Sequence, residues 1–144
     1  MAYRLINHLV VVFLLCPYTA YGETVCSGSA ADISCLMRNF DDFYHKNYSD
    51  FWKVLHSSLK EAEHCRSIEA TSSFLNLASL HSTNAEFNEF FAESIENLCL
   101  TSPKCFSDAN NLLPKATQER LKMFLNNPLF IDKEHLYKSG CLKH

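Results

Sequence analysis

TNAEFNEFFAESIENLC, residues 83–99, is the stretch around which we expect the rest of this chain to pack. With about 100° of rotation per residue, its large apolar residues fall on one side of a helix, namely Phe87, Phe90, Phe91, Ile95 and Leu98. Its glutamates fall on the other side, namely Glu86, Glu89, Glu93 and Glu96. Thr83 and Glu86 have the spacing of a capping box, so we expect Thr83 to cap this helix.

The N-terminus has the pattern of a secretory signal peptide. Arg4 precedes an unbroken apolar run at residues 9–16, and Pro17 ends that run before small residues. We therefore expect a signal peptide at residues 1–22, cleavage after Gly22 and secretion into the extracellular space. The apolar run is too short to cross a bilayer, and no later segment approaches the roughly 20 apolar residues that a span needs. The sequence thus predicts no membrane span.

The charge of the secreted part disfavours nucleic acid as a partner. Removing residues 1–22 takes away Arg4 and no acidic residue, which leaves 12 Lys and Arg against 16 Asp and Glu, a formal net charge of -4. Phosphate binding needs clustered basic residues. The densest basic run, from Lys115 to Lys122, is interrupted by Glu119.

Six cysteines remain after the signal peptide takes Cys16 away: Cys26, Cys35, Cys65, Cys99, Cys105 and Cys141. An even number in a secreted chain predicts disulfides, here three, and six cysteines allow 15 pairings. The chain contains no CxxC pair, so a zinc site is disfavoured. The first two predicted helices are joined by a short turn and should lie antiparallel. This arrangement makes Cys35 or Cys26 the expected partner of Cys65.

Residues 23–144 are expected to form a single domain of the all-α class, a disulfide-stapled bundle of about five to seven helices. The whole chain has only three glycines and four prolines, which leaves few sites for tight hairpin turns. Helical periodicity recurs throughout. The expected helices cover about residues 29–46, 49–64, 66–81, 83–99, 103–113, 115–126 and 132–138. Ser49 and Asp132 are the expected caps of the second and the last helix.

Asn47, Tyr48 and Ser49 fit the Asn-x-Ser pattern of N-glycosylation. The tripeptide separates two predicted helices, where we expect an exposed turn. In a secreted chain, this placement predicts a glycan on Asn47.

No pattern of residues predicts catalysis, a metal or a cofactor, so we expect a protein that is not an enzyme. His45, His56, His64 and His81 include no pair three or four residues apart, the spacing that helical metal ligands need. The chain contains no GxSxG, HExxH, glycine-rich phosphate loop or calcium-loop motif.

The acidic side of residues 83–99 suggests the first functional hypothesis. Like charges at spacings of three and four residues repel by ~0.2–0.5 kcal/mol per pair. The row of Glu86, Glu89, Glu93 and Glu96 is either an ordinary solvated face or a face that a cationic partner neutralises. The hypothesis is an extracellular interaction protein that binds an unknown protein through this exposed helix face.

The phenylalanine content suggests the alternative, a carrier of a lipid or another small apolar ligand. Ten of the eleven phenylalanines lie after the signal peptide. The candidates for an apolar cavity are Phe74, Phe87, Phe90, Phe91, Phe106 and Phe124, together with Phe130. The same rings can instead fill a solid core, where each contributes ~1.5–3 kcal/mol on burial.

Overall fold

The structure is a computed structural model that describes residues 26–141, so the predicted signal peptide lies outside the described residues. Within this range it contains helices and no strand, which confirms the predicted all-α class. The 3-10 helices are η1 (Ala30–Asp32) and η2 (Asn76–Ser79). The α-helices are α1 (Ile33–Arg38), α2 (Phe40–Lys46), α3 (Tyr48–Glu63), α4 (Ile68–Leu75), α5 (Ala85–Thr101), α6 (Pro103–Asn110), α7 (Lys115–Asn126) and α8 (Lys133–Lys138). The eight α-helices of the described range exceed the expected five to seven.

The extra helix arises because the predicted helix at residues 29–46 is broken. Asn39 lies between α1 and α2 with φ −126°, outside the helical region. Its side-chain amide donates to the Cys35 carbonyl at 3.1 Å, and its backbone carbonyl accepts from Phe43 N at 2.7 Å. Asparagine side chains compete with the helical backbone in this way and favour helix ends. The same residue therefore ends α1 and begins α2.

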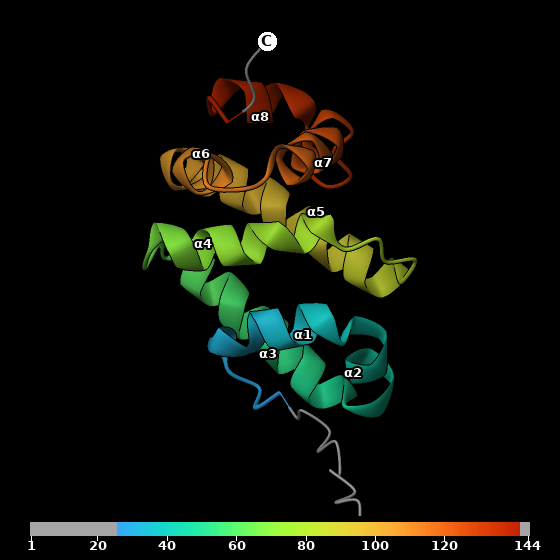
Figure 1. The fold of residues 1–144 in the computed structure, drawn as a ribbon. Helices are drawn as coiled ribbons and strands as arrows, with labels where there is room; N and C mark the ends of the chain where they lie inside the picture. The colour runs from blue at the N-terminus through green and yellow to red at the C-terminus, as the bar shows by residue number, and fades with distance from the viewer. Residues whose placement is uncertain (1–25, 142–144) are drawn as a thin grey trace, which may run out of the picture.

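The helices are arranged along the molecule nearly in chain order. Figure 1 shows α1, α2 and α3 at one end, α4 and α5 across the middle, and α8 at the far end near the C-terminus. Helix α4 packs between α3 and α6, while α7 packs on η2 and α8 packs on α5 and α7. Helix α5 thus contacts both the N-terminal and the C-terminal helices, as its predicted aromatic stripe suggested.

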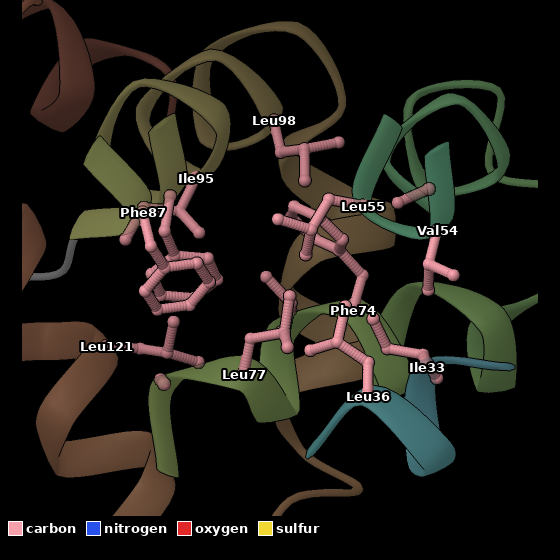
Figure 2. Packing of buried hydrophobic residues seen from close by; sticks show 14 of the residues in the cluster. Ile33, Leu36, Val54, Leu55, Phe74, Leu77, Phe87, Ile95, Leu98 and Leu121 are labelled. Carbon is pink, nitrogen blue, oxygen red and sulfur yellow. The ribbon is translucent and has the colours of Figure 1, made fainter. Parts of the chain in front are cut away.

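The core is built from the apolar faces of these helices. Phe87, Ile95 and Leu98 of α5 meet Phe74 and Leu77 from the α4 and η2 segment, with Leu121 of α7 on one side and Ile33, Leu36, Val54 and Leu55 on the other (Figure 2). Each of these ten side chains is at most 5% exposed. Residues three or four positions apart on each helix supply the buried face, which is the ordinary pattern of an amphipathic helix.

Three disulfides join the six cysteines, as predicted, but the predicted partner of Cys65 is wrong. Cys65 pairs with Cys105, and the other bridges are Cys26–Cys35 and Cys99–Cys141. The chain before α1 folds back on that helix, which places the Cα of Cys26 5.9 Å from that of Cys35. Cys65 leaves α3 with a left-handed φ of 45°, a turn that directs α4 toward α6.

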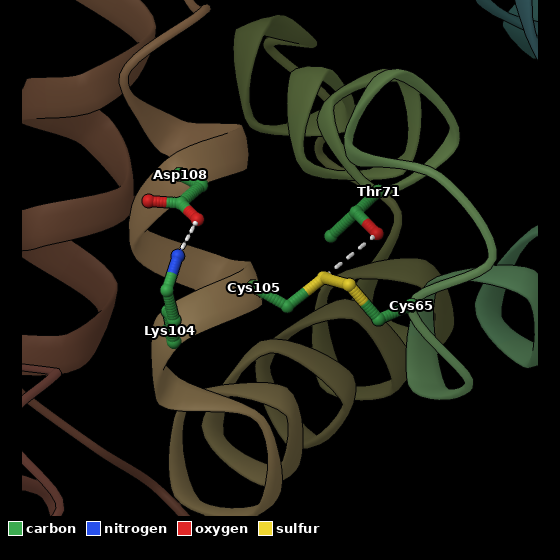
Figure 3. Close-up of polar contacts among 5 residues, drawn as sticks. All are labelled: Cys65, Thr71, Lys104, Cys105 and Asp108. Atoms are coloured by element: carbon green, nitrogen blue, oxygen red, sulfur yellow. Dashed lines mark hydrogen bonds and ion pairs between the residues drawn. A yellow bond between two sulfur atoms is a disulfide. The ribbon is translucent and has the colours of Figure 1, made fainter.

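The Cys65–Cys105 bridge ties the end of α3 to α6. Figure 3 shows this bridge beside Thr71 of α4, whose hydroxyl lies 3.5 Å from Cys105 Sγ, and the exposed ion pair between Lys104 and Asp108 on α6. Thr71 is completely buried. Its hydroxyl also donates to the Ser67 carbonyl at 3.1 Å, so no buried hydroxyl is left unsatisfied here.

The residues that cap the helices agree only in part with the predicted caps. Asn84, not Thr83, caps α5, because its side-chain oxygen accepts from Phe87 N at 3.0 Å. Helix α3 begins at Tyr48, so Asn47 is its cap rather than Ser49. The predicted cap at Asp132 is confirmed, since its carboxylate accepts from Glu134 N at 2.8 Å.

Candidate functional site

A surface groove lies between α3 and α5 and has a volume of about 460 Å³. We call it the acidic groove. Its lining comes from three places in the chain: Tyr48, Trp52 and His56 of α3; Glu86, Glu89, Phe90 and Glu93 of α5; and Phe130 of the segment between α7 and α8. Aromatic rings and carboxylates therefore face the same space.

Helical spacing places these side chains on one face of each helix. Tyr48, Trp52 and His56 are four residues apart and lie above one another along α3. The lining residues of α5 are spaced by three and four residues in the same way. Since α3 and α5 pack against each other, the two rows flank one groove.

Aromatic side chains form a connected wall of the groove. The Phe90 ring lies edge to face on Trp52 and on His56, with centroid distances of 5.3 Å and 5.1 Å. Tyr48 continues the row at 6.1 Å from Trp52. The Nε1 atom of Trp52 is buried and has no hydrogen-bond partner among the described residues, which is uncommon for a buried donor.

Glu86 is held in place by two tyrosines. The hydroxyls of Tyr44 and Tyr48 donate to its two carboxylate oxygens at 2.8 Å and 2.6 Å. The hydrogen bond to Glu86, together with desolvation, raises the pKa of Tyr48, because the protonated hydroxyl is needed as donor. These bonds connect the first turn of α5 to the junction of α2 and α3, and they orient the carboxylate without neutralising it.

Glu89 and Glu93 also lie exposed at the groove. None of the ion pairs found within residues 26–141 involves Glu86, Glu89 or Glu93. The three carboxylates are three or four residues apart, a spacing at which like charges repel. Among residues 26–141, therefore, no ion pair offsets the charge of the three carboxylates at the groove.

Glu96 does not belong to this exposed face, and its predicted place there is wrong. Its side chain is 1% exposed, and its carboxylate accepts three backbone N–H groups, from Leu129 at 2.7 Å, Phe130 at 2.9 Å and Ile131 at 2.8 Å. The segment between α7 and α8 covers α5 at this turn. Burial of the carboxylate is possible because these N–H groups replace its hydration.

The predicted apolar-cavity residues are distributed over several places. Phe74, Phe87 and Phe91 are at most 2% exposed, and their rings pack in a row with centroid distances of 5.8 Å, as in a filled core. Phe106 is buried in α6, whereas Phe90 lines the acidic groove.

The Phe124 ring packs edge to face on Phe91 at a centroid distance of 5.6 Å, so it adjoins that row, but it also reaches the surface. It lines a second hollow, of about 390 Å³, together with Arg120, Met123, Asn127 and Leu129. We call this the α7 hollow. Met123 and Leu129 are 67% and 69% exposed, so the hollow has an apolar rim.

The sequence patterns missed the part of the groove that lies outside α5. Tyr48, Trp52 and His56 had a detectable signal, because aromatic side chains at intervals of four residues form a stripe on one helix face. Phe130 had none, since its place at the groove depends on the contact of its backbone with Glu96.

Other predicted features are placed as follows. Asn47 is exposed and lies between α2 and α3, directly before the groove residue Tyr48. Within residues 26–141, no group of three or more His, Cys, Asp or Glu side chains is arranged to hold a metal ion. No helix in this range combines the length and apolar character needed to cross a membrane.

Comparison with known proteins identified no relative of this chain. No family model, no curated protein and no solved structure matches the chain.

Proposed function

We propose that this chain is a secreted, non-enzymatic interaction protein that binds an extracellular protein through the acidic groove. The observation that carries the proposal is the set of three exposed carboxylates, Glu86, Glu89 and Glu93, for which residues 26–141 supply no ion-pair partner. A partner that brings positive charge would relieve their mutual repulsion. Such complementarity raises association rates and excludes partners of the wrong charge.

The aromatic wall supports a basic partner as well. Lysine and especially arginine side chains bind over the faces of Trp, Tyr and Phe, and they pack their apolar stems against such rings. Trp52 and Phe90 lie in the same groove as the carboxylates. An arginine in the groove would therefore find a carboxylate for its guanidinium and a ring for its flat face.

The disulfides support the extracellular part of the proposal. Three bridges within residues 26–141 are typical of proteins from oxidising compartments. A mature chain that begins at Glu23, a single disulfide-stapled helical bundle and a glycan on Asn47 belong to the same proposal. Intact and deglycosylated masses of the protein from its own secretions would test cleavage, bridges and glycan together.

Charge reversal in the groove tests the function. The protein is purified without detergent from the fluid into which it is secreted, its bound partner is identified by native mass spectrometry, and that partner is titrated against purified variants. We expect the double variant Glu89→Lys, Glu93→Lys to weaken binding by at least about tenfold, the equivalent of ~1.4 kcal/mol.

The control for this experiment changes the net charge equally at another place. Glu63 and Glu119 are exposed and do not line the acidic groove. The variant Glu63→Lys, Glu119→Lys should bind like the unaltered protein. Equal binding by the groove variant, or an equal loss in both variants, would reject the groove as the binding site.

A carrier of a small apolar ligand is the second candidate, and the α7 hollow is the observation that favours it. Its volume of about 390 Å³ lies within the range of ligand pockets, about 300–1,000 Å³. Excess mass that organic solvent removes from the detergent-free protein would support this candidate. A mass of the polypeptide and its glycan that the same extraction leaves unchanged would reject it.

A further inference from the structure

We propose that the acidic groove selects basic segments that carry a large apolar side chain beside the basic one, and that Glu96 is the positioning residue for this selection. The inference rests on the proposed function and extends it from the charge of the partner to its apolar character. Phe130 supplies the apolar contact, and Glu96 holds the segment that carries Phe130.

The contact of Glu96 with the segment is specific and buried. One carboxylate oxygen accepts from Leu129 N at 2.7 Å, and the other accepts from Phe130 N at 2.9 Å and Ile131 N at 2.8 Å. Three successive N–H groups thus converge on one side chain that is 1% exposed. Hydrogen bonds to an ionised group are stronger than neutral ones, so this segment has a defined conformation.

The anchored segment presents two neighbouring side chains to two different hollows. Phe130 is 52% exposed and lines the acidic groove, while Leu129 is 69% exposed and lines the α7 hollow. Large apolar side chains exposed at this level, on a segment fixed by a buried charge, are candidates for contact with a partner. Of these two side chains, only Phe130 lines the groove that contains the carboxylates.

The lining of the groove defines the chemistry of its occupant. Glu89 and Glu93 favour a cationic group, and Trp52, Phe90 and Phe130 favour apolar surface. A polyanion or an anionic membrane surface would meet three carboxylates and be repelled. A polar cationic segment would satisfy the carboxylates but leave Phe130 in water. The best complement is a peptide segment in which Arg or Lys adjoins a residue such as Leu or Phe.

The test uses two fluorescent peptides of equal length and charge and the intact secreted protein. One peptide alternates Arg with Leu, and the other alternates Arg with Ser. Fluorescence anisotropy measures both dissociation constants, and their ratio reports the apolar selection. We expect the unaltered protein to bind the Arg-Leu peptide about tenfold more tightly, the scale of one well-placed aromatic contact.

Three variants assign the ratio to its cause. Phe130→Ser and Glu96→Gln should lower the ratio several-fold while leaving the affinity for the Arg-Ser peptide unchanged; Trp52 and Phe90 keep the remaining apolar contact. Leu129→Ser removes a neighbour from the same segment that is even more exposed than Phe130, and it should leave the ratio unchanged. Because Phe130→Ser alters only a surface side chain, it tests the selection even where Glu96→Gln fails to fold. A defect that was only structural would weaken the binding of both peptides.

The outcomes separate the inference from the proposed function. Binding of both peptides with a ratio that Phe130→Ser and Glu96→Gln do not change would overturn the inference and leave the basic-partner proposal standing. Binding of neither peptide would overturn both. Two results together would establish the proposed function and the inference. The double variant Glu89→Lys, Glu93→Lys would lose binding of both peptides, and only Phe130→Ser and Glu96→Gln would lower the ratio.

Discussion

Replacing Glu96 with alanine should be among the most damaging single changes to the stability of this protein. The substitution removes the acceptor of three backbone N–H groups, those of residues 129–131. An N–H group left without a partner costs about 1–3 kcal/mol when buried. Because the three donors are only partly buried and water can reach some of them, we use the lower half of this range.

The expected loss in unfolding free energy is about 3–6 kcal/mol, from three donors at roughly 1–2 kcal/mol each. A domain of this size has about 5–15 kcal/mol in total, so the change removes a large share. Glu96→Gln keeps the shape and one carbonyl acceptor, so its loss should lie between that of alanine and zero. Urea unfolding followed by far-ultraviolet circular dichroism gives both values.

The matched control is Glu93→Ala, which lies three residues earlier on the same helix but is exposed. Its effect should stay within about 0.5 kcal/mol. Amide hydrogen exchange adds a local measurement, because residues 129–131 should lose protection in Glu96→Ala and keep it in Glu93→Ala. Equal stability of the two variants, or unchanged protection of these amides, would refute the assignment of Glu96 as a buried anchor.

Three further predictions concern a bridge and two titrating groups. The double variant Cys65→Ser, Cys105→Ser opens a bridge with a sequence separation of 40 and should lower the unfolding free energy by about 4 kcal/mol. Opening the Cys26–Cys35 bridge, with a separation of 9, should lower it by about 2.6 kcal/mol. Thermal unfolding checks this order, which a reversal would contradict. Glu86→Gln should lower the pKa of Tyr48 toward its ordinary value, because the carboxylate raises it in the unaltered protein. Because the pKa of Tyr48 is raised in the folded state, its hydrogen bond stabilises the fold fully below the unfolded pKa, and this contribution disappears as the pH rises through the folded pKa. An NMR titration should show that Tyr48 ionises at a lower pH in the variant than in the unaltered protein. An unchanged titration would contradict the prediction. Hydrogen bonds from Ser27 and Ser29 lower the pKa of Asp32. The contribution of Asp32 to the unfolding free energy is therefore complete above its unfolded pKa and disappears as the pH falls through its folded pKa. Urea unfolding at falling pH should therefore lose less stability in Asp32→Asn, and identical pH profiles would count against the assignment.

Helix positions followed from local sequence where the chain carries its own start and stop signals. Helix α7 occupies residues 115–126 as predicted, directly after Pro114, and Asp132 caps α8 as predicted. Caps and prolines act on backbone groups within one turn, so neighbouring residues suffice to place them. The break at Asn39 was missed because the apolar periodicity continues through it, and asparagine tolerates both a helix interior and a helix end.

The groove was predictable only in part. The spacing of Glu86, Glu89 and Glu93 placed them on one side of α5, and the structure leaves all three exposed. The three-residue spacing that continues to Glu96 gave the same expectation for that residue. Nothing in residues 83–99 indicates that a segment more than 30 positions later covers the last turns of the helix.

Local sequence was sufficient for the helical class, most helix positions and the exposed side of α5 that carries Glu86, Glu89 and Glu93, because a period of about 3.6 residues is a property of one segment. Tertiary structure alone decided the partner of Cys65, the burial of Glu96 and the meeting of Trp52, Glu89 and Phe130 at one groove. These features depend on which distant segments pack together. A helix pattern shows which residues share a face, whereas the contacts of the whole chain determine whether that face meets water, a carboxylate or another helix.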